Sequence, residues 1–219
     1  MTHGERGARF EAADLYVVIT EAFCAGRSAL DVLDAVLDAG VKLVQCREKD
    51  CDDSIYYERA LAFRERTAKA GALLIIDDRV DIALAAGADG VHLGTADLPI
   101  QTARAIAPEL LLGASSHSIE EALAAQDAGA DYVNIGPVFD TQTKAVPTGT
   151  VGPALIGALR PHLRIPFTTM GGIKAHNIRD VLAQGARRIA VVTAVTAAED
   201  VRAAAKELRE AIGAWPECP

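Results

Sequence analysis

The stretch AAGADGVHLG (85–94) joins the end of a helix, a tight turn and the start of a strand. Ala-rich sequence runs up to Gly87, and glycine adopts the left-handed conformation just past a helix at little cost. A short apolar run follows. The same arrangement recurs in DAGVKLVQCRE (38–48), DAGADYVNIG (127–136) and AQGARRIAVVT (183–193). Four copies of helix, turn and strand predict an α/β protein built from repeating units.

Short apolar runs elsewhere complete the pattern, as expected for strands of a parallel sheet that helices cover. The predicted strands lie near residues 15–19, 41–46, 73–77, 89–93, 110–114, 131–135, 166–170 and 188–193. The predicted helices lie near residues 28–39, 54–70, 79–86, 99–107, 118–128, 152–160, 174–184 and 197–212. Eight strand–helix units in 219 residues predict a single-domain (β/α)8 TIM barrel.

An open, doubly wound sheet is the alternative fold. Such a sheet would need fewer units and usually carries a Gly-rich loop after its first strand. Residues 20–23, which follow the predicted first strand, read Thr-Glu-Ala-Phe and favour the barrel. We assign residues 14–213 to the barrel, residues 1–13 to a flexible N-terminal tail and residues 214–219 to a C-terminal tail.

Charge and composition exclude several classes of protein. The 22 Lys and Arg residues against 30 Asp and Glu residues give a net charge of −8, which argues against a general nucleic-acid binder. No apolar run approaches the roughly 20 residues of a membrane span, and residues 1–13 lack the apolar core of a signal peptide. Four cysteines without regular spacing favour a reducing compartment. We therefore expect a cytoplasmic protein with no nucleic-acid or membrane partner.

Polar and glycine residues gather where the predicted strands end. In a TIM barrel the carboxyl ends of the strands form the active face, so these residues are expected to meet there. In chain order they are Gln45, Arg47, Lys49, Asp77, Asp78, His92, Asp97, Ser115, His117, Thr141, Thr143, Lys144, Gly171, Gly172, Val192 and Thr193. This concentration at one face predicts an enzyme.

Arg47 and Lys49 are two residues apart, so they point the same way from an extended chain. Two cations on one side suit a polyanion such as a diphosphate. The alternative is a solvated surface pair, because Glu48 and Asp50 can neutralise the two charges.

Asp78 and Asp97 follow successive predicted strands, which are neighbours in a barrel. Two carboxylates at the barrel mouth suit Mg²⁺, which binds a few carboxylates together with phosphate oxygens and water. The alternative is that each aspartate caps the helix that follows it, since Asp is a good N-cap residue.

Gly171 and Gly172 come just before a predicted helix, where bare backbone amides can bind a phosphate. TIM barrels often place a phosphate site after the seventh and eighth strands. The alternative is an ordinary tight turn. His92 alternates with apolar neighbours on its strand, so we expect it to line the barrel rather than to act in chemistry.

Five segments together resemble the thiamine-phosphate synthases. They are VQCREKD (44–50), IIDDRVDIALAAGADGVHLGTADLP (75–99), GASSHS (113–118), ADYVNIGPVFDTQTK (130–144) and MGGI (170–173). The resemblance extends from about Leu15 to Thr196, nearly the whole predicted barrel. It rests on the segment 75–99 and on the combination of REK, TxTK and GGI.

The resemblance implies a transferase that joins hydroxymethylpyrimidine diphosphate to a thiazole phosphate carrying a carboxylate. The products would be thiamine phosphate, pyrophosphate and CO2. Pyrophosphate would depart first, and the thiazole nitrogen would then capture the pyrimidine methylene cation. Such a reaction demands no strong nucleophile or general base.

By the same resemblance, each substrate has its own contacts. The pyrimidine diphosphate would contact Gln45, Arg47, Lys49, Ser115 and Lys144. Mg²⁺ would be held by Asp78 and Asp97. The thiazole phosphate would contact Thr141, Thr143, Gly172, Val192 and Thr193. The residues expected to act in catalysis are Arg47, Lys49, Ser115 and Lys144.

The chain departs from the family at one position of the implied site. Asp77 stands where the family usually has an Asn that reads the pyrimidine ring. An ionised Asp cannot donate a hydrogen bond, but it can accept one from an exocyclic amine or bind a metal. Asp77 therefore stays a candidate substrate-binding residue.

Three other functions remain open. A thiazole tautomerase would share the barrel and the thiazole-phosphate site but would need no diphosphate or Mg²⁺ site. A sugar-phosphate isomerase or epimerase would need an acid–base pair, for which Cys46 and Asp78 are the candidates. A non-enzymatic barrel would bind ligands without turnover, and only Asp77 points there. The sequence is compatible with a homo-oligomer and does not fix its size.

Overall fold

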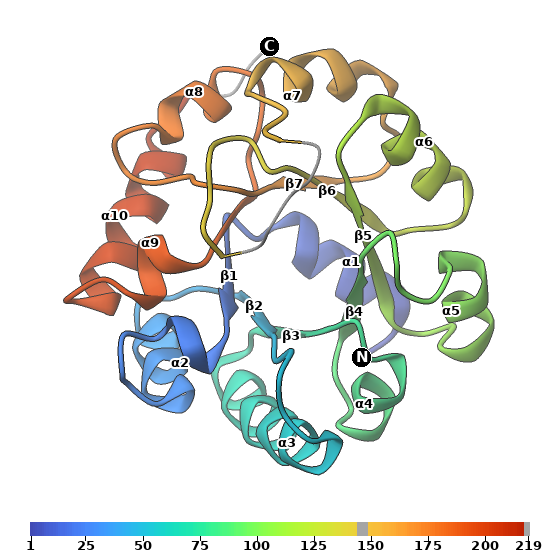
Figure 1. Cartoon of the computed structure of the whole chain (residues 1–219), viewed down its shortest axis with the longest axis vertical. Helices are drawn as coiled ribbons and strands as arrows, with labels where there is room; N and C mark the ends of the chain where they lie inside the picture. The colour runs from blue at the N-terminus through green and yellow to red at the C-terminus, as the bar shows by residue number, and fades with distance from the viewer. Residues whose placement is uncertain (144–148, 217–219) are drawn as a thin grey trace.

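The computed structural model describes residues 1–143 and 149–216. Eight parallel strands form a closed barrel, in which each strand pairs with the next and β8 pairs with β1. Figure 1 looks along the barrel, with the strands in the centre and helices around them. The predicted (β/α)8 TIM barrel is therefore confirmed.

The strands are short, as predicted from their apolar runs. They are β1 (Leu15–Ile19), β2 (Leu43–Cys46), β3 (Leu73–Asp77), β4 (Gly90–Leu93), β5 (Leu111–Ser116), β6 (Tyr132–Ile135), β7 (Phe167–Thr169) and β8 (Ile189–Val191). The helices are α1 (His3–Glu11), η1 (Glu21–Phe23), α2 (Ala29–Asp38), α3 (Asp53–Ala70), α4 (Val80–Ala85), α5 (Ile100–Ile106), α6 (Ile119–Asp127), α7 (Ala154–Leu159), η2 (Arg160–His162), α8 (Ile178–Leu182), α9 (Thr193–Thr196) and α10 (Val201–Gly213).

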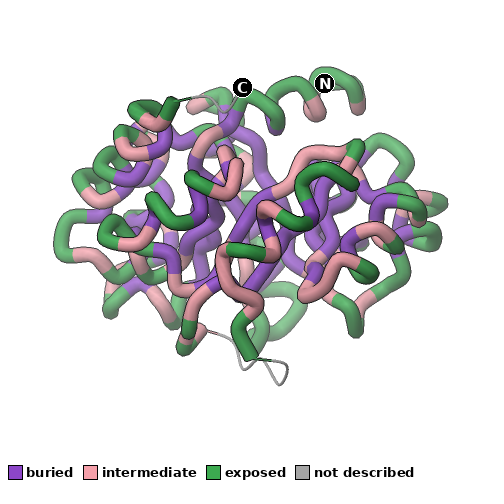
Figure 2. Tube along the Cα trace, turned by 90° about the horizontal axis from the view of Figure 1, so that it is seen from above, coloured by how far each residue is buried: buried purple, intermediate pink, exposed green. Residues whose placement is uncertain are grey.

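Alternate residues of each strand face the barrel interior and the surrounding helices. On β3, Leu74 and Ile76 pack between the sheet and the helices, whereas Leu73 and Ile75 pack inside the barrel. Asp77, the next inward position, lines a cavity at the end of the strand. Figure 2 shows the buried chain in the middle of the molecule and the exposed chain around it. The inward positions thus change from apolar to polar toward the carboxyl ends of the strands.

The N-terminal residues form a helix, which corrects the flexible tail predicted for residues 1–13. Helix α1 buries Phe10 against Tyr132, with the ring centroids 4.3 Å apart. Arg188, which precedes β8, donates a hydrogen bond to the Phe10 carbonyl at 3.1 Å. In Figure 2 this helix lies across one end of the barrel. It therefore closes the end where the strands begin, away from the polar end of the barrel.

Helix α8 is shorter than the helix predicted for residues 174–184. The Asn177 side chain accepts a hydrogen bond from the Lys174 amide at 2.7 Å and donates one to the Gly172 carbonyl at 3.0 Å. Such side-chain bonds to nearby backbone compete with helical hydrogen bonds. The helix therefore begins only at Ile178.

The last strand and the C-terminal residues also differ from the prediction. Strand β8 ends at Val191, and Thr193 begins the short helix α9. Trp215, which the sequence assigns to a tail, packs partly buried against the core. Over residues 1–143 and 149–216, no helix is both long and apolar enough to cross a membrane.

Candidate active site

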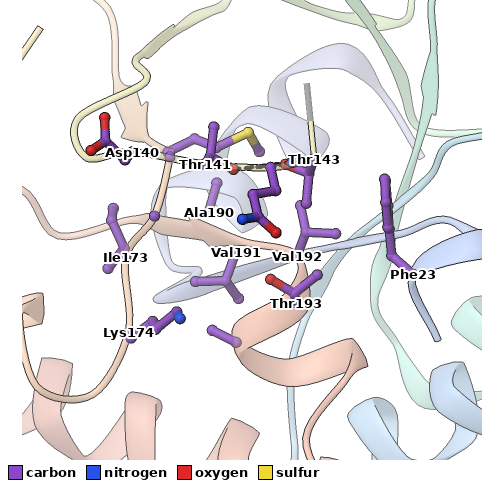
Figure 3. Close-up of a pocket in the computed structure, with 15 residues that line it drawn as sticks. Phe23, Asp140, Thr141, Thr143, Ile173, Lys174, Ala190, Val191, Val192 and Thr193 are labelled. Carbon is purple, nitrogen blue, oxygen red and sulfur yellow. Dashed lines mark hydrogen bonds between the residues drawn. The ribbon is translucent and has the colours of Figure 1, made fainter. Parts of the chain in front are cut away.

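Two adjacent cavities open at the carboxyl ends of the strands. The larger, of about 570 Å³, is lined by the segments after β6, β7 and β8 and is drawn in Figure 3. Among the predicted site residues it is lined by Thr141, Thr143, Gly172, Val192 and Thr193. The smaller, of about 80 Å³, is lined among them by Gln45, Arg47, Asp77, Ser115, Thr143 and Val192. Because both include Thr143 and Val192, the cavities meet, and residues from six strand ends gather at one face.

The larger cavity has the groups that bind a phosphate. Gly172 has a φ of +62°, a conformation that costs other residues energy, and a Cβ there would collide with the chain at Phe139 and Asp140. Thr193 and Lys174 add a hydroxyl and an ammonium group to the lining. The Thr141 and Thr143 hydroxyls are 3.0 Å apart and hydrogen-bonded, as the dashed line in Figure 3 marks. Hydroxyls, a cation and glycine backbone around one cavity suit a phosphate group.

The helix that faces this cavity differs from the predicted one. Because α8 begins at Ile178, its first turn lies several residues beyond Gly172. Thr193 and Ala194, the first residues of α9, line the cavity directly. The amides of Val195 and Thr196 donate to the Val192 carbonyl, so Thr193 and Ala194 supply the candidate N–H donors of α9 at this cavity.

A sharp turn ends β3. The Arg79 amide donates to the Asp77 carbonyl at 2.7 Å, and Asp78 between them has a φ of +60°. Three-residue turns with positive φ are rare and strained, and Asp is one of the few residue types that tolerate the conformation. The turn presents two carboxylates to one cation, because Lys49 Nζ lies 3.0 Å from Asp77 Oδ2 and also hydrogen-bonds to Asp78.

Arg47 joins the same cluster. Its Nε lies 3.4 Å from Asp77 Oδ2, so both Arg47 and Lys49 face the buried carboxylate. Glu48 pairs with Arg59 instead. The alternative of a surface pair neutralised by Glu48 is therefore wrong for Arg47 and Lys49.

The carboxyl groups of the cluster have shifted pKa values. Burial and the neighbouring Asp78 carboxylate raise the pKa of Asp77 to about 6, against the opposing effect of Lys49 and Arg47. Partial burial acts to raise the pKa of Asp78, but hydrogen bonds with Lys49 and Asp97 lower it overall. Burial and the hydrogen bond with Asp78 raise the pKa of Asp97.

Asp78 and Asp97 lie together, and neither caps a helix. Their carboxyl groups are close enough to shift each other's pKa values in opposite directions. Asp97 Oδ2 accepts from the Gly94 amide at 2.7 Å, and the N-cap position of α4 is Arg79. Two adjacent hard oxygen donors fit Mg²⁺. In the part of the chain that the structure describes, no three His, Cys, Asp or Glu side chains form a metal-binding group. A cation here would therefore take its other ligands from substrate and water.

Some predicted residues lie elsewhere. Lys144 is outside the described residues. Cys46 packs in the core between the sheet and the helices, where burial raises the pKa of its thiol well above the usual value. The acid–base pair of Cys46 with Asp78 is therefore not formed. His117 lies 3.0 Å from the Glu121 carboxylate at the start of α6.

Two lining residues were not found from the sequence. Asn134 follows Tyr132 at the next inward-facing position of β6, so the alternation of inward and outward residues along the strand could have identified it. Its Oδ1 accepts a hydrogen bond from the Thr168 hydroxyl at 2.8 Å. Lys174 comes directly after the MGGI motif but was assigned to a helix.

Comparisons with known proteins agree on one family. The family model for thiamine monophosphate synthase matches residues 15–195. A thiamine-phosphate synthase from Chloroflexus aurantiacus is 44% identical over 203 residues, covering 93% of this chain and 94% of its own. One from Shouchella clausii is 39% identical over 199 residues, covering 90% and 95%. The solved thiamine phosphate pyrophosphorylase from Pyrococcus furiosus superposes with a TM-score of 0.85 at 39% identity, covering 92% and 96%.

Proposed function

The chain belongs to the thiamine monophosphate synthase family, and on that premise we propose how its two cavities divide the reaction. It is an enzyme, a transferase that forms thiamine phosphate. The smaller cavity takes hydroxymethylpyrimidine diphosphate and the larger takes the thiazole phosphate. This division rests on one observation. The smaller cavity, which Arg47 lines, and the larger cavity, which has groups that suit a phosphate, share Phe23, Thr143, Met170 and Val192. The two reacting groups can therefore meet at the shared wall.

The diphosphate lies against Lys49 and Arg47, with Ser115 donating to it. Lys144 acts on it as well, by the resemblance of its TxTK motif. Thr141, Thr143, Gly172, Val192 and Thr193 hold the thiazole phosphate. Gln45 and Asp77 face the pyrimidine from the inner wall of the smaller cavity.

The reaction breaks the bond between the pyrimidine methylene carbon and the bridging diphosphate oxygen. The electron pair leaves with pyrophosphate, and the thiazole nitrogen supplies the pair for the new carbon–nitrogen bond. A carboxylated thiazole then loses CO2. Negative charge develops on the departing oxygens, so the cations that face them stabilise the transition state.

The donor set of Asp78 and Asp97 fits Mg²⁺. When bound, Mg²⁺ would supply positive charge to the leaving diphosphate. Lys49 lies beside this pair, so it holds the acidic cluster together in the free enzyme and faces the diphosphate when substrate binds.

A thiazole tautomerase is the second candidate, since it would need only the larger cavity. The cluster of Lys49, Arg47, Asp77 and Asp78, of which Arg47 and Asp77 line the smaller cavity, favours the synthase. We also propose a cytoplasmic location, which the free thiols of Cys24 and Cys46 support.

A coupling assay tests the proposal. With both substrates and Mg²⁺, the protein should release pyrophosphate and thiamine phosphate in equal amounts, measured by a phosphate-detecting assay and by chromatography. Omitting either substrate should stop formation of thiamine phosphate. Substrate binding in a calorimeter without pyrophosphate release would contradict the proposal and favour a non-enzymatic barrel.

Asp77→Asn should lower the KM for the diphosphate substrate about two- to fivefold, the range expected from weakening one ion pair. Asp77 competes with the substrate for Lys49 and Arg47, and an Asn still offers an acceptor to the pyrimidine amine. Initial rates against diphosphate concentration measure the change. Asp81→Asn, at an exposed carboxylate paired with Arg79, is the matched control and should leave KM unchanged. A tenfold rise in KM for Asp77→Asn would mean that the substrate uses the carboxylate charge.

A further inference from the structure

A chain of hydrogen bonds crosses the barrel interior. Gln45 Nε2 donates to the Tyr16 hydroxyl at 2.7 Å, and the Tyr16 and Tyr132 hydroxyls are 3.3 Å apart. The Tyr132 hydroxyl lies 3.1 Å from His92 Nδ1, and His92 Nε2 lies 3.0 Å from Ser115 Oγ. Both ends of the chain, Gln45 and Ser115, line the smaller cavity. The chain therefore links two walls of one site through the barrel core.

The direction of the protons follows from the chemistry of each member. Burial raises the pKa of both tyrosines, so each hydroxyl keeps a proton to donate. An amide nitrogen can only donate, so Tyr16 accepts from Gln45, and we assign the Tyr16 proton to the bond with Tyr132, which gives it an acceptor within the chain. Tyr132 then donates to His92 Nδ1, which must be the bare nitrogen.

A doubly protonated His92 would not fit this chain. Gln45 would then donate to Tyr16, and His92 Nδ1 would donate to Tyr132. The proton of one of the two tyrosines would have no acceptor within the chain, which is costly in a buried site. With a neutral ring protonated on Nε2, each hydrogen bond of this chain has one donor and one acceptor. That proton is donated to Ser115 Oγ, so the Ser115 hydroxyl proton points elsewhere.

The barrel makes room for this contact at Gly113. A Cβ added there would collide with the Tyr132 ring and with His92 Nδ1. Gly113 lies two positions before Ser115 on the inward face of β5 and opposite His92 in the sheet register. The hydroxyl–imidazole contact therefore depends on a missing side chain beside it.

We propose that His92 is a positioning residue, whose neutral Nε2–H form turns the Ser115 hydroxyl proton into the smaller cavity as a donor to the diphosphate. This rests on the proposed function for the identity of the acceptor. His92 lines the barrel, as expected from the sequence, and the proposal adds this positioning role. A serine hydroxyl that already accepts from a fixed neighbour is ready to donate to an anion, with little reorganisation.

The first test needs no substrate. Two-bond ¹H–¹⁵N spectra of the ¹⁵N-histidine protein at neutral pH should show a protonated Nε2 and a bare Nδ1 for one of the five histidines. The signal is assigned by its loss in His92→Gln. Tyr132→Phe should shift this ring toward a mixture of the two neutral forms. A protonated Nδ1 in the unmodified protein would overturn the proposal.

The second test replaces His92 with two amide side chains of different length, Gln and Asn. The Gln amide nitrogen falls near the position of Nε2 and can still donate to Ser115, whereas the shorter Asn cannot reach it. We expect His92→Asn to raise the KM for the diphosphate about tenfold and His92→Gln to restore most of the loss. In a Ser115→Ala background, His92→Asn should add no further loss, because its effect passes through the hydroxyl.

The outcomes separate this inference from the proposed function. Equal losses for the Asn and Gln variants, or a further loss in the Ser115→Ala background, would show a structural role only and overturn the inference. An unmodified protein with the Nε2–H form but no coupling activity would instead contradict the proposed function.

Discussion

Lys49→Ala should lower kcat for coupling about 100-fold, which corresponds to roughly 2.7 kcal/mol of transition-state stabilisation. In the proposed site Lys49 faces the departing pyrophosphate, and a contact that strengthens during bond cleavage acts on kcat more than on KM. In the free enzyme this lysine also lies between Asp77 and Asp78. Its removal leaves two carboxylates without their shared cation.

Single-turnover rates with both substrates saturating measure this change. Lys69→Ala is the matched control, because Lys69 is an exposed lysine paired with Glu65 on α3, and it should keep full activity. Thermal unfolding of both variants shows whether folding has changed. A folded Lys49→Ala variant with more than half of the kcat would remove Lys49 from the proposed role.

The sequence predicts the fold because each unit repeats a local rule. A glycine such as Gly87 ends a helix, and a strand with alternating inward and outward residues follows. The same alternation places Gln45, Asp77 and Ser115 on inward positions at strand ends, where they line one cavity. Patterns of this kind can be recognised in the sequence without knowing which distant residues contact each other.

Contacts between distant segments are what the sequence could not predict. Helix α1 depends on Phe10 packing against Tyr132, more than a hundred residues away, and its own sequence is polar. The path from Gln45 to Ser115 likewise depends on which inward side chains meet across the barrel. The strain at Asp78 is also invisible in the sequence, since Asp is common at ordinary helix starts.

Replacing Asp78 should remove most Mg²⁺-dependent activity, and the backbone at this position allows a clean test. Asp78→Asn keeps a residue type that tolerates a φ of +60°, and Asp78→Gly adopts it freely, so neither variant adds backbone strain. We expect at least a tenfold higher Mg²⁺ concentration for half-maximal activity in Asp78→Asn, because a neutral amide is a weaker ligand. In Asp78→Gly the rate at saturating Mg²⁺ should fall about 100-fold.

The comparison of these variants separates metal binding from geometry. Asp78→Ala keeps the β-carbon in the strained turn and loses the polar group of Asp, so its unfolding temperature should fall below that of Asp78→Gly. If the loss of activity followed the unfolding temperature across the three variants, the turn rather than the carboxylate would matter. If activity instead follows the oxygen donor at position 78, with Asn above Gly and Ala whatever their unfolding temperatures, the side chain of residue 78 is a metal ligand. Unchanged Mg²⁺ dependence in Asp78→Asn would contradict that role.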